Sequence, residues 1–148
     1  MSNLKELIQN LQQNFTNNLK DMRPYIQGYD GNDWQEFYKL EKNNYTRNLI
    51  FQNDDFEIFL IVWDNGSRAK IHDHSDNGCI YKILDGKLVE KRYNIKNLSL
   101  LSLQMLNKGQ VGYIDNSIGY HSIENKSHQP CVSLHIYSPP NYQTKILG

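Results

Sequence analysis

Two histidines and a cysteine stand close together in the stretch IHDHSDNGC, which runs from Ile71 to Cys79. The chain has 148 residues but only five histidines and two cysteines. His72 and His74 are separated by one residue, and side chains at positions i and i+2 of a strand point to the same face. We therefore expect the two imidazoles to lie close enough to share one metal ion.

A third histidine stands in a similar context. His121 follows the turn residues of GYIDNSIGYHSIEN and lies in an apolar segment that reads as a strand. Three neutral imidazoles suit iron, zinc, copper or nickel, and three protein ligands leave coordination positions open for substrate or water. The three histidines together predict an open metal site, which is typical of catalysis.

The segments that position these histidines are predicted to be strands. From Tyr45 onward, short runs rich in Ile, Val, Leu, Tyr and Phe alternate with turn signals. The turn signals are Asp64-Asn65-Gly66, Asn77-Gly78, Asp85-Gly86, Lys108-Gly109 and Pro139-Pro140. Strands at such regular spacing indicate a mainly β protein, built as a sandwich or a barrel.

The N-terminal part of the chain is predicted to be helical. Apolar residues recur at spacings of three and four from Leu4 to Met22, which makes one stripe on an amphipathic helix over residues 2–22. Ser2 is the expected N-cap of this helix, and a second short helix is expected to start near Asn32. These helices are expected to pack against the outside of the strands.

The whole chain, residues 1–148, is predicted to form a single domain, because a chain of this length buries enough surface for one core. Within it, a helical segment of about residues 2–40 precedes a barrel of about residues 45–148.

The composition argues against nucleic acid and membranes as partners. Sixteen Lys and Arg balance sixteen Asp and Glu, without a basic run that would favour nucleic acid or an anionic membrane. The longest apolar runs are of strand length, and the N-terminus lacks the pattern of a signal peptide. Cys79 and Cys131 are too few for a disulfide framework. We expect a cytoplasmic monomer that acts on small molecules.

The spacing around the first two histidines resembles the first cupin motif. Gly66 stands six residues before His72, and Cys79 takes the place of the metal-binding Glu that most cupins carry. The second cupin motif is approximated by Gly112, Gly119, His121 and Asn125, although its proline is absent. The cupin fold is a small antiparallel barrel whose mouth holds the metal, which agrees with the strand pattern.

One branch of cupins replaces that Glu with Cys, and the chain resembles the cysteine dioxygenase family of this branch. The resemblance runs from about the first helix to Asn141. It rests on YTRN at Tyr45, HDHSDNGC at His72, DNSIGYH ending at His121 and SLHIYSPP beginning at Ser133. It implies a single cupin-type antiparallel β-barrel and a non-heme Fe(II) thiol dioxygenase, which inserts both atoms of O2 into the thiol of L-cysteine to give cysteine sulfinic acid.

The resemblance also implies roles for individual residues. The iron ligands fall on His72, His74 and His121, the substrate-binding residues on Arg47 and Tyr45, the catalytic residues on Cys79, His135 and Tyr137, and a supporting residue just behind the iron site on Ser133. Cys79 and Tyr137 match the partners of the family's cysteine–tyrosine thioether. The same resemblance makes Ser138-Pro139 an expected cis peptide bond.

The chemistry of these residue types agrees with the resemblance. Neutral histidine in place of an acidic ligand leaves the double charge of Fe(II) uncompensated, which favours capture of an anionic thiolate. The guanidinium of Arg47 can bind a carboxylate through two parallel hydrogen bonds. Asn77-Gly78 favours a turn or bulge that resets the strand alternation, so that Cys79 faces the same side as His74.

Three alternatives stay open at the level of sequence. The chain can be a related thiol dioxygenase acting on a mercapto acid or on aminoethanethiol, although Arg47 argues against a substrate without a carboxylate. It can be a non-catalytic cupin that binds a metal or a small ligand, or a zinc site that activates water. The family's second pocket cysteine has no equivalent, and Thr144 falls near its position.

Overall fold

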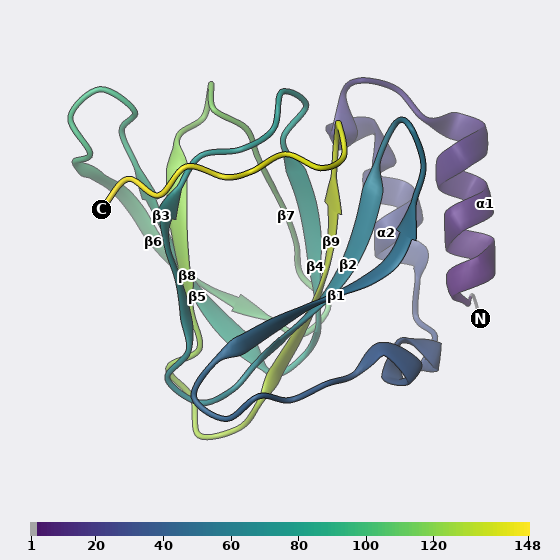
Figure 1. Cartoon of the computed structure of the whole chain (residues 1–148), viewed down its shortest axis with the longest axis horizontal. Helices are drawn as coiled ribbons and strands as arrows, with labels where there is room; N and C mark the ends of the chain where they lie inside the picture. The colour runs from purple at the N-terminus through teal and green to yellow at the C-terminus, as the bar shows by residue number, and fades with distance from the viewer. Residues whose placement is uncertain (1–2) are drawn as a thin grey trace.

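The computed structural model describes residues 3–148 and is built on two antiparallel sheets that face each other (Figure 1). The sheets have the strand orders β1-β2-β9-β4-β7 and β3-β8-β5-β6. The strands are β1 Tyr45–Gln52, β2 Glu57–Trp63, β3 Arg68–His72, β4 Cys79–Asp85, β5 Lys87–Tyr93, β6 Leu100–Asn107, β7 Val111–Ile114, β8 Tyr120–Glu124 and β9 Cys131–Tyr137. The mainly β prediction is confirmed, but strand pairing does not continue from one sheet into the other, so the barrel is open.

The five-stranded sheet separates two apolar cores. On β2, Leu60 and Val62 face the helices, whereas Ile61 and Trp63 face the interior between the sheets. β4 and β9 alternate in the same way, which puts Cys79 on the interior face. This alternation follows from the two-residue period of strand side chains, and it gives the polar residues of β9 a shared interior surface.

The helices cover the outer face of the five-stranded sheet (Figure 1). They are α1 Leu4–Asn14, η1 Leu19–Met22, α2 Arg23–Gly28 and η2 Asp33–Phe37. None of the helices within residues 3–148 is long and apolar enough to cross a membrane. The short helix expected near Asn32 is confirmed as the 3-10 helix η2.

The prediction of one continuous helix over residues 2–22 was wrong. The chain leaves the helix after Asn14, and the side chain of Asn18 accepts from the backbone N–H of Lys20 to start a new turn. Asn and Thr side chains compete in this way with helical backbone hydrogen bonds. Ser2, the expected N-cap, lies outside the described residues, and the side chain of Asn3 caps α1 instead.

The C-terminal segment crosses from β9 to the far sheet over the opening between them (yellow in Figure 1). It begins at the predicted cis bond between Ser138 and Pro139, which is confirmed. It ends in an antiparallel bridge between Ile146 and His72, the last residue of β3. The segment therefore passes directly beside the first histidine of the predicted metal site.

Candidate metal centre

The three predicted histidines converge at one end of the four-stranded sheet, where β3 ends and β8 begins. His72 and His121 are direct cross-strand partners on β3 and β8, and His74 lies two residues beyond the end of β3. One ring nitrogen from each histidine lies within 4.8 Å of the others. His74 and His121 are buried, and His72 is half-buried.

Each of these histidines presents its Nδ1 to an oxygen acceptor. The distances are 2.6 Å from His72 to the carbonyl of Lys70, 3.2 Å from His74 to Oδ1 of Asn116, and 2.8 Å from His121 to Oε2 of Glu90. An acceptor at Nδ1 places the ring proton there, which leaves the Nε2 lone pair free. The three side chains are thus held in the tautomer that ligates metal through Nε2.

The three Nε2 lone pairs have no hydrogen-bond donor from the described residues that would satisfy them. Nε2 of His74 is the one buried side-chain nitrogen or oxygen within residues 3–148 that has no hydrogen-bond partner. Nε2 of His121 lies 3.1 Å from Nε2 of His72, so two lone pairs point toward one another. A divalent cation at this point would satisfy all three nitrogens, so the residues fit a three-histidine metal site.

The electrostatic environment keeps two of these ligands neutral. Burial, reinforced by the neighbouring His121, lowers the pKa of His72 to about 4 and the pKa of His74 to about 2. A histidine must be neutral to bind a metal. Both side chains are therefore ready to bind at neutral pH without first losing a proton.

Cys79, His135 and Tyr137 form a second cluster on the opposite sheet. Cys79 begins β4 and is the direct cross-strand partner of Tyr137 on β9. Nδ1 of His135 lies 3.6 Å from the Cys79 sulfur and 3.2 Å from the Tyr137 phenol oxygen. The Asn77-Gly78 turn resets the alternation as expected: Gly78 has φ +80°, and a Cβ there would lie 2.3 Å from the carbonyl oxygen of Ile114.

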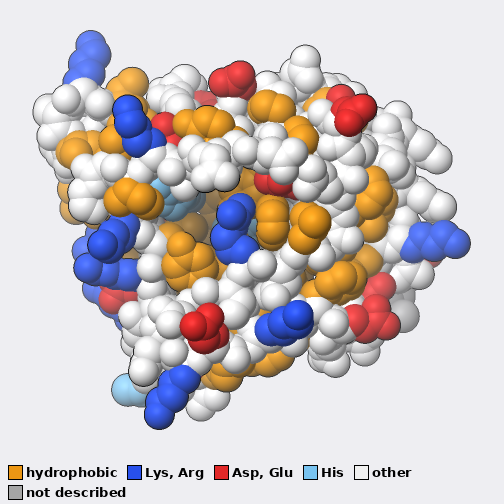
Figure 2. All heavy atoms as spheres, viewed as in Figure 1, with side chains coloured by type: hydrophobic (Ala, Val, Ile, Leu, Met, Phe, Trp, Pro, Cys, Tyr) orange, Lys and Arg blue, Asp and Glu red, His pale blue; other side chains and the backbone are white. Residues whose placement is uncertain are grey.

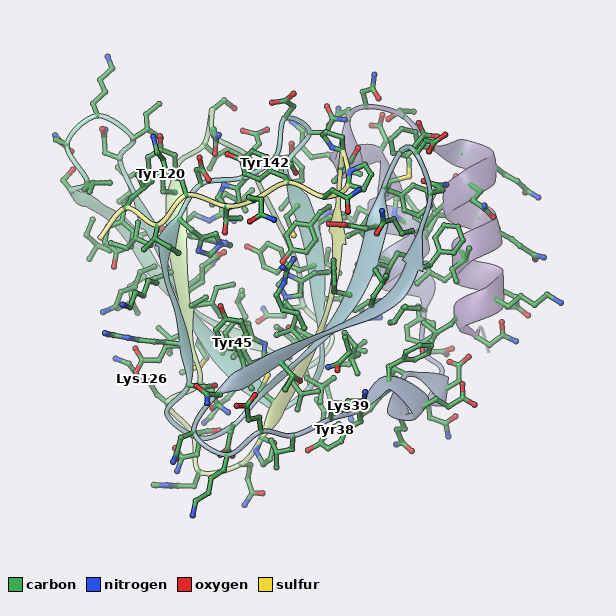
Figure 3. All side chains as sticks on the ribbon, viewed as in Figure 1. Tyr38, Lys39, Tyr45, Tyr120, Lys126 and Tyr142 are labelled. Atoms are coloured by element: carbon green, nitrogen blue, oxygen red, sulfur yellow. The ribbon has the colours of Figure 1, made fainter. Side chains whose placement is uncertain are left out.

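A small cavity of about 90 Å³ joins the two clusters. Tyr45 lies between the two sheets, and Tyr142 lies on the segment that crosses above it (Figure 3). In the middle of this face, histidine and Lys or Arg side chains lie beside hydrophobic ones (Figure 2). The cavity is lined on its polar side by Tyr45, Arg47, Lys70, His72, His121, His135, Tyr137 and Thr144.

Two cationic side chains, Arg47 and Lys70, line the cavity. Arg47 is the one with a rigid, planar donor group. Its guanidinium carbon lies 4.3 Å from the ring centre of Phe59 and 5.4 Å from that of Tyr137. No carboxylate of residues 3–148 forms an ion pair with it. Its five donors therefore keep capacity for an anionic group that enters the cavity.

Comparison with known proteins decides the family. The sequence profile of "Cysteine dioxygenase type I" matches residues 1–147. The chain belongs to this family. The cysteine dioxygenase type 1 proteins of Danio rerio and Bos taurus are each 37% identical to it, over 93% of this chain and 75% and 74% of theirs.

Solved structures support the fold. A Klebsiella pneumoniae protein with a double-stranded β-helix domain has a TM-score of 0.65 at 13% identity, covering 77% of this chain and 93% of that one. A cupin superfamily protein of Desulfitobacterium hafniense has a TM-score of 0.56 at 18% identity, covering 68% and 83%. This cysteine dioxygenase family member is therefore a dioxygenase of the cupin type, and the predicted cupin fold is confirmed.

One expectation about the metal ligands was wrong in its structural detail. His72 and His74 were expected on one strand, but β3 ends at His72. His74 is instead placed by Asn116, whose side chain accepts from the His74 backbone N–H at 2.9 Å and donates to its carbonyl at 3.2 Å. The two hydrogen bonds from the Asn116 side chain to the His74 backbone therefore position His74, where a continuous strand was expected to do so.

Three residues at this candidate site were missed by sequence reasoning: Asn116, Glu90 and Trp63. The indole N–H of Trp63 donates to the Ser133 hydroxyl at 2.9 Å, and that hydroxyl lies 2.8 Å from Nε2 of His135. A buried Trp requires an acceptor for its N–H, and this was the available signal. Glu90 gave no such signal, because Lys91 and Arg92 follow it in the sequence and make it look like part of a charged surface segment.

Proposed function

We propose that this chain is an iron-dependent dioxygenase that converts L-cysteine into cysteine sulfinic acid. The observation that carries the proposal is one small cavity lined by His72 and His121 of the three converging histidines, by an arginine without a carboxylate partner among residues 3–148, and by Tyr137, the cross-strand partner of Cys79. Family membership supports the same activity. The proposal includes a single domain over residues 1–148 that works as a cytoplasmic monomer on small molecules.

The reaction adds both atoms of O2 to the substrate sulfur, so that R–SH and O2 give R–SO2H. The sulfur loses four electrons and dioxygen gains them, and no other reductant is needed. His72, His74 and His121 would hold Fe(II), and the ion would supply the open coordination positions that this chemistry needs. With three neutral ligands the ion keeps its full charge, which favours an anionic sulfur ligand.

Arg47 is proposed to anchor the carboxylate of the substrate. Its place on β1 beside Tyr45 directs both side chains into the cavity that His72 borders. Stacking on Phe59 limits the orientations of the guanidinium, so less rotamer freedom remains to be lost when a carboxylate binds. A carboxylate held there leaves the thiol end of a small amino acid free to point toward the histidines.

Ser133 and His135 are proposed to orient the phenol of Tyr137. Since the Trp63 indole can only donate, the Ser133 oxygen accepts from it, and its hydroxyl hydrogen is free for Nε2 of His135. The His135 proton then resides on Nδ1 and points toward the Tyr137 oxygen. This polarity leaves the phenol hydrogen of Tyr137 free to bind an oxygen or sulfur atom in the cavity.

Oxygen consumption by iron-loaded protein tests the proposal, with L-cysteine, 3-mercaptopropionate and cysteamine supplied in parallel. The proposal predicts uptake of one O2 per thiol with L-cysteine and a product 32 mass units heavier, that is, two oxygen atoms of about 16 each. Preference for 3-mercaptopropionate would identify the related mercapto-acid enzyme. No uptake with any thiol, despite bound iron, would point to a binding protein.

A variant links this activity to the histidines. His121→Ala should lose most bound iron while it keeps the β-rich circular dichroism spectrum of the parent. Full iron occupancy in this variant would contradict the assigned site, whichever thiol the parent prefers.

A further inference from the structure

Glu90 is a fully buried carboxylate on β5 and lies directly behind the metal ligand His121. A buried charge is costly unless it is paired and hydrogen-bonded. Glu90 meets this requirement through four side chains around its two oxygens. Its partners are His121 at 2.8 Å, Arg92 at 3.2 Å, Gln104 at 2.8 Å and the phenol of Tyr81 in a short hydrogen bond.

The acceptor behind His121 differs in kind from the acceptors behind the other two histidines. His72 faces a backbone carbonyl and His74 faces an amide oxygen, both of which are neutral. Only His121 of these three donates to a carboxylate. A carboxylate behind a ligating histidine fixes the tautomer and the ring orientation and makes the Nε2 lone pair a stronger donor. His121 is therefore the ligand that the protein holds and activates most firmly.

Tyr81 connects this carboxylate to the second cluster of the cavity. Its phenol donates to Glu90, and its ring stacks on His135 with centroids 5.4 Å apart and planes at 18°. The ring fits because Gly112, its cross-strand partner, has no side chain: a Cβ there would lie 2.5 Å from the Tyr81 ring. One tyrosine thus contacts both the support of a metal ligand and the histidine that orients Tyr137.

We propose that Glu90 is a positioning residue for the metal centre and that Tyr81 holds the Glu90 carboxylate in the orientation that fixes His121. The inference rests on the three-histidine site of the proposed function but does not depend on which thiol is oxidised. Arg92 balances the charge of Glu90 and also donates to the carbonyl of Tyr113 at 2.8 Å, which ties the pair to β7. Neither Glu90 nor Tyr81 lines the cavity, so both act through other residues.

The affinity for Fe(II) tests this inference without any turnover. It is measured anaerobically by competition with a chromophoric chelator. Glu90→Gln keeps the shape of the side chain but removes its charge, and it should weaken Fe(II) binding by roughly 10- to 100-fold. Asp33→Asn is the matched control. Like Glu90, Asp33 accepts a hydrogen bond from a tyrosine, but it lies among the outer helices, where its second partner is a backbone N–H. The control should bind Fe(II) like the parent.

A spectroscopic measurement separates positioning from general loosening. In Co(II)-loaded protein, the Nδ1 protons of the three ligands should give three paramagnetically shifted, exchangeable NMR resonances. Glu90→Gln should move one of them strongly, that of His121, and leave the other two near their parent positions. Three unmoved resonances with a Fe(II) affinity within twofold of the parent would overturn the inference.

Tyr81→Phe keeps the test decisive if Glu90→Gln does not fold. It retains the stacked ring and removes the phenol hydroxyl, which donates to Glu90 and accepts from Arg92 at 3.2 Å. It should therefore weaken Fe(II) binding by a smaller factor than loss of the carboxylate charge. Tyr29→Phe is its control, since Tyr29 is a buried tyrosine bound to Asp33 away from the site. Equal affinities of parent and Tyr81→Phe would overturn the role of Tyr81. A parent that binds no Fe(II) would overturn the three-histidine site itself, which is a distinct result.

Discussion

Cys79 and Tyr137 stand directly opposite each other on the antiparallel strands β4 and β9, and the Cys79 sulfur and the Tyr137 phenol oxygen both lie near Nδ1 of His135. Burial raises the pKa of the Cys79 thiol and of the Tyr137 phenol, so both carry their protons at neutral pH. A protonated, buried thiol is a poor nucleophile. Joining the sulfur to the tyrosine ring also removes two hydrogens, so a bond between the two residues must form by oxidation.

We predict that a thioether forms between the Cys79 sulfur and the ring carbon next to the Tyr137 hydroxyl. Each residue gives up one electron and one proton, and dioxygen accepts both pairs to become hydrogen peroxide. The bond should be absent from protein made without iron and should accumulate during turnover. Intact mass should fall by about two units, the mass of two hydrogens, and digestion should yield a fused Cys79–Tyr137 peptide.

Two cysteine variants control this measurement. Cys131 is buried on the same face of β9 but stands opposite Trp63, so Cys131→Ala should still form the crosslink. Cys79→Ala should not form the crosslink. Its activity should be reduced but not lost, because the Tyr137 phenol, which the crosslink would fix in place, must then be ordered in each turnover. A free Cys79 thiol after prolonged turnover would contradict the prediction.

Arg47→Ala should impair the oxidation of thiols that carry a carboxylate. The Arg47 side chain lines the cavity and is exposed, so its hydrogen bonds to a carboxylate should be worth about 1.5–3 kcal/mol. This corresponds to a loss of roughly 10- to 100-fold in kcat/KM for L-cysteine.

Activity with cysteamine, which has no carboxylate, provides the internal comparison. It should change little in Arg47→Ala, and Arg68→Ala, an exposed arginine on β3, should leave both substrates unaffected. An Arg47→Ala protein that oxidises L-cysteine as well as the parent would exclude Arg47 as the anchor.

The sequence predicted the parts of this site that depend on strand period and on short motifs. Tyr45 and Arg47 share one face of β1, and Ser133, His135 and Tyr137 share one face of β9, as the alternation of strand side chains requires. The Asn77-Gly78 turn explained how Cys79 reaches the interior. The roles assigned to these residues stay predictions that the experiments above test.

The parts that sequence did not predict depend on contacts between distant segments. Asn116 lies 42 positions from His74, and Glu90 lies 31 positions from His121. Such pairs leave no local periodicity, because the two strands or loops meet only after the sheets have formed. The break in the N-terminal helix is different, since Asn and Thr side chains give a local signal there that apolar spacing alone ignores.

The stability of the metal-free protein should fall when the pH is lowered through 6.5. Folding lowers the pKa of His72 to about 4 and of His74 to about 2, in both cases mainly through burial. Between pH 6.5 and 5 the unfolded chain therefore binds protons that the folded protein does not. The free energy of unfolding should fall toward lower pH by up to about 1.4 kcal/mol per pH unit for each such histidine.

Urea denaturation of metal-free protein at pH 7.5, 6.0 and 5.0 measures this slope. His74→Asn should reduce the slope, because one lowered pKa is lost. His128→Gln is the control variant, because it also removes one histidine but from an exposed loop position outside the site. A free energy of unfolding that is the same at pH 7.5 and pH 5.0 would show that these histidines are not held neutral by the fold.

Asp73, between the first two histidines, should control how firmly the C-terminal segment covers the cavity. Its carboxylate accepts from the Tyr142 phenol at 2.8 Å and from the backbone N–H of Lys145 at 2.6 Å. Thr144 and Ile146 of this segment line the cavity. Asp73→Asn should weaken these hydrogen bonds by about 1 kcal/mol, which increases the detached fraction of the segment roughly fivefold.

Hydrogen exchange of residues 142–147 should therefore be faster in Asp73→Asn, and KM for L-cysteine should rise, because the wall of the cavity that this segment supplies is less often in place. Fe(II) affinity should stay close to that of the parent, since the Nδ1 acceptors of the three histidines are intact. Asp76→Asn, in the same loop and exposed, is the matched control and should change neither exchange nor KM. Unchanged exchange in Asp73→Asn would mean that the backbone bridge between Ile146 and His72 holds the segment without the carboxylate.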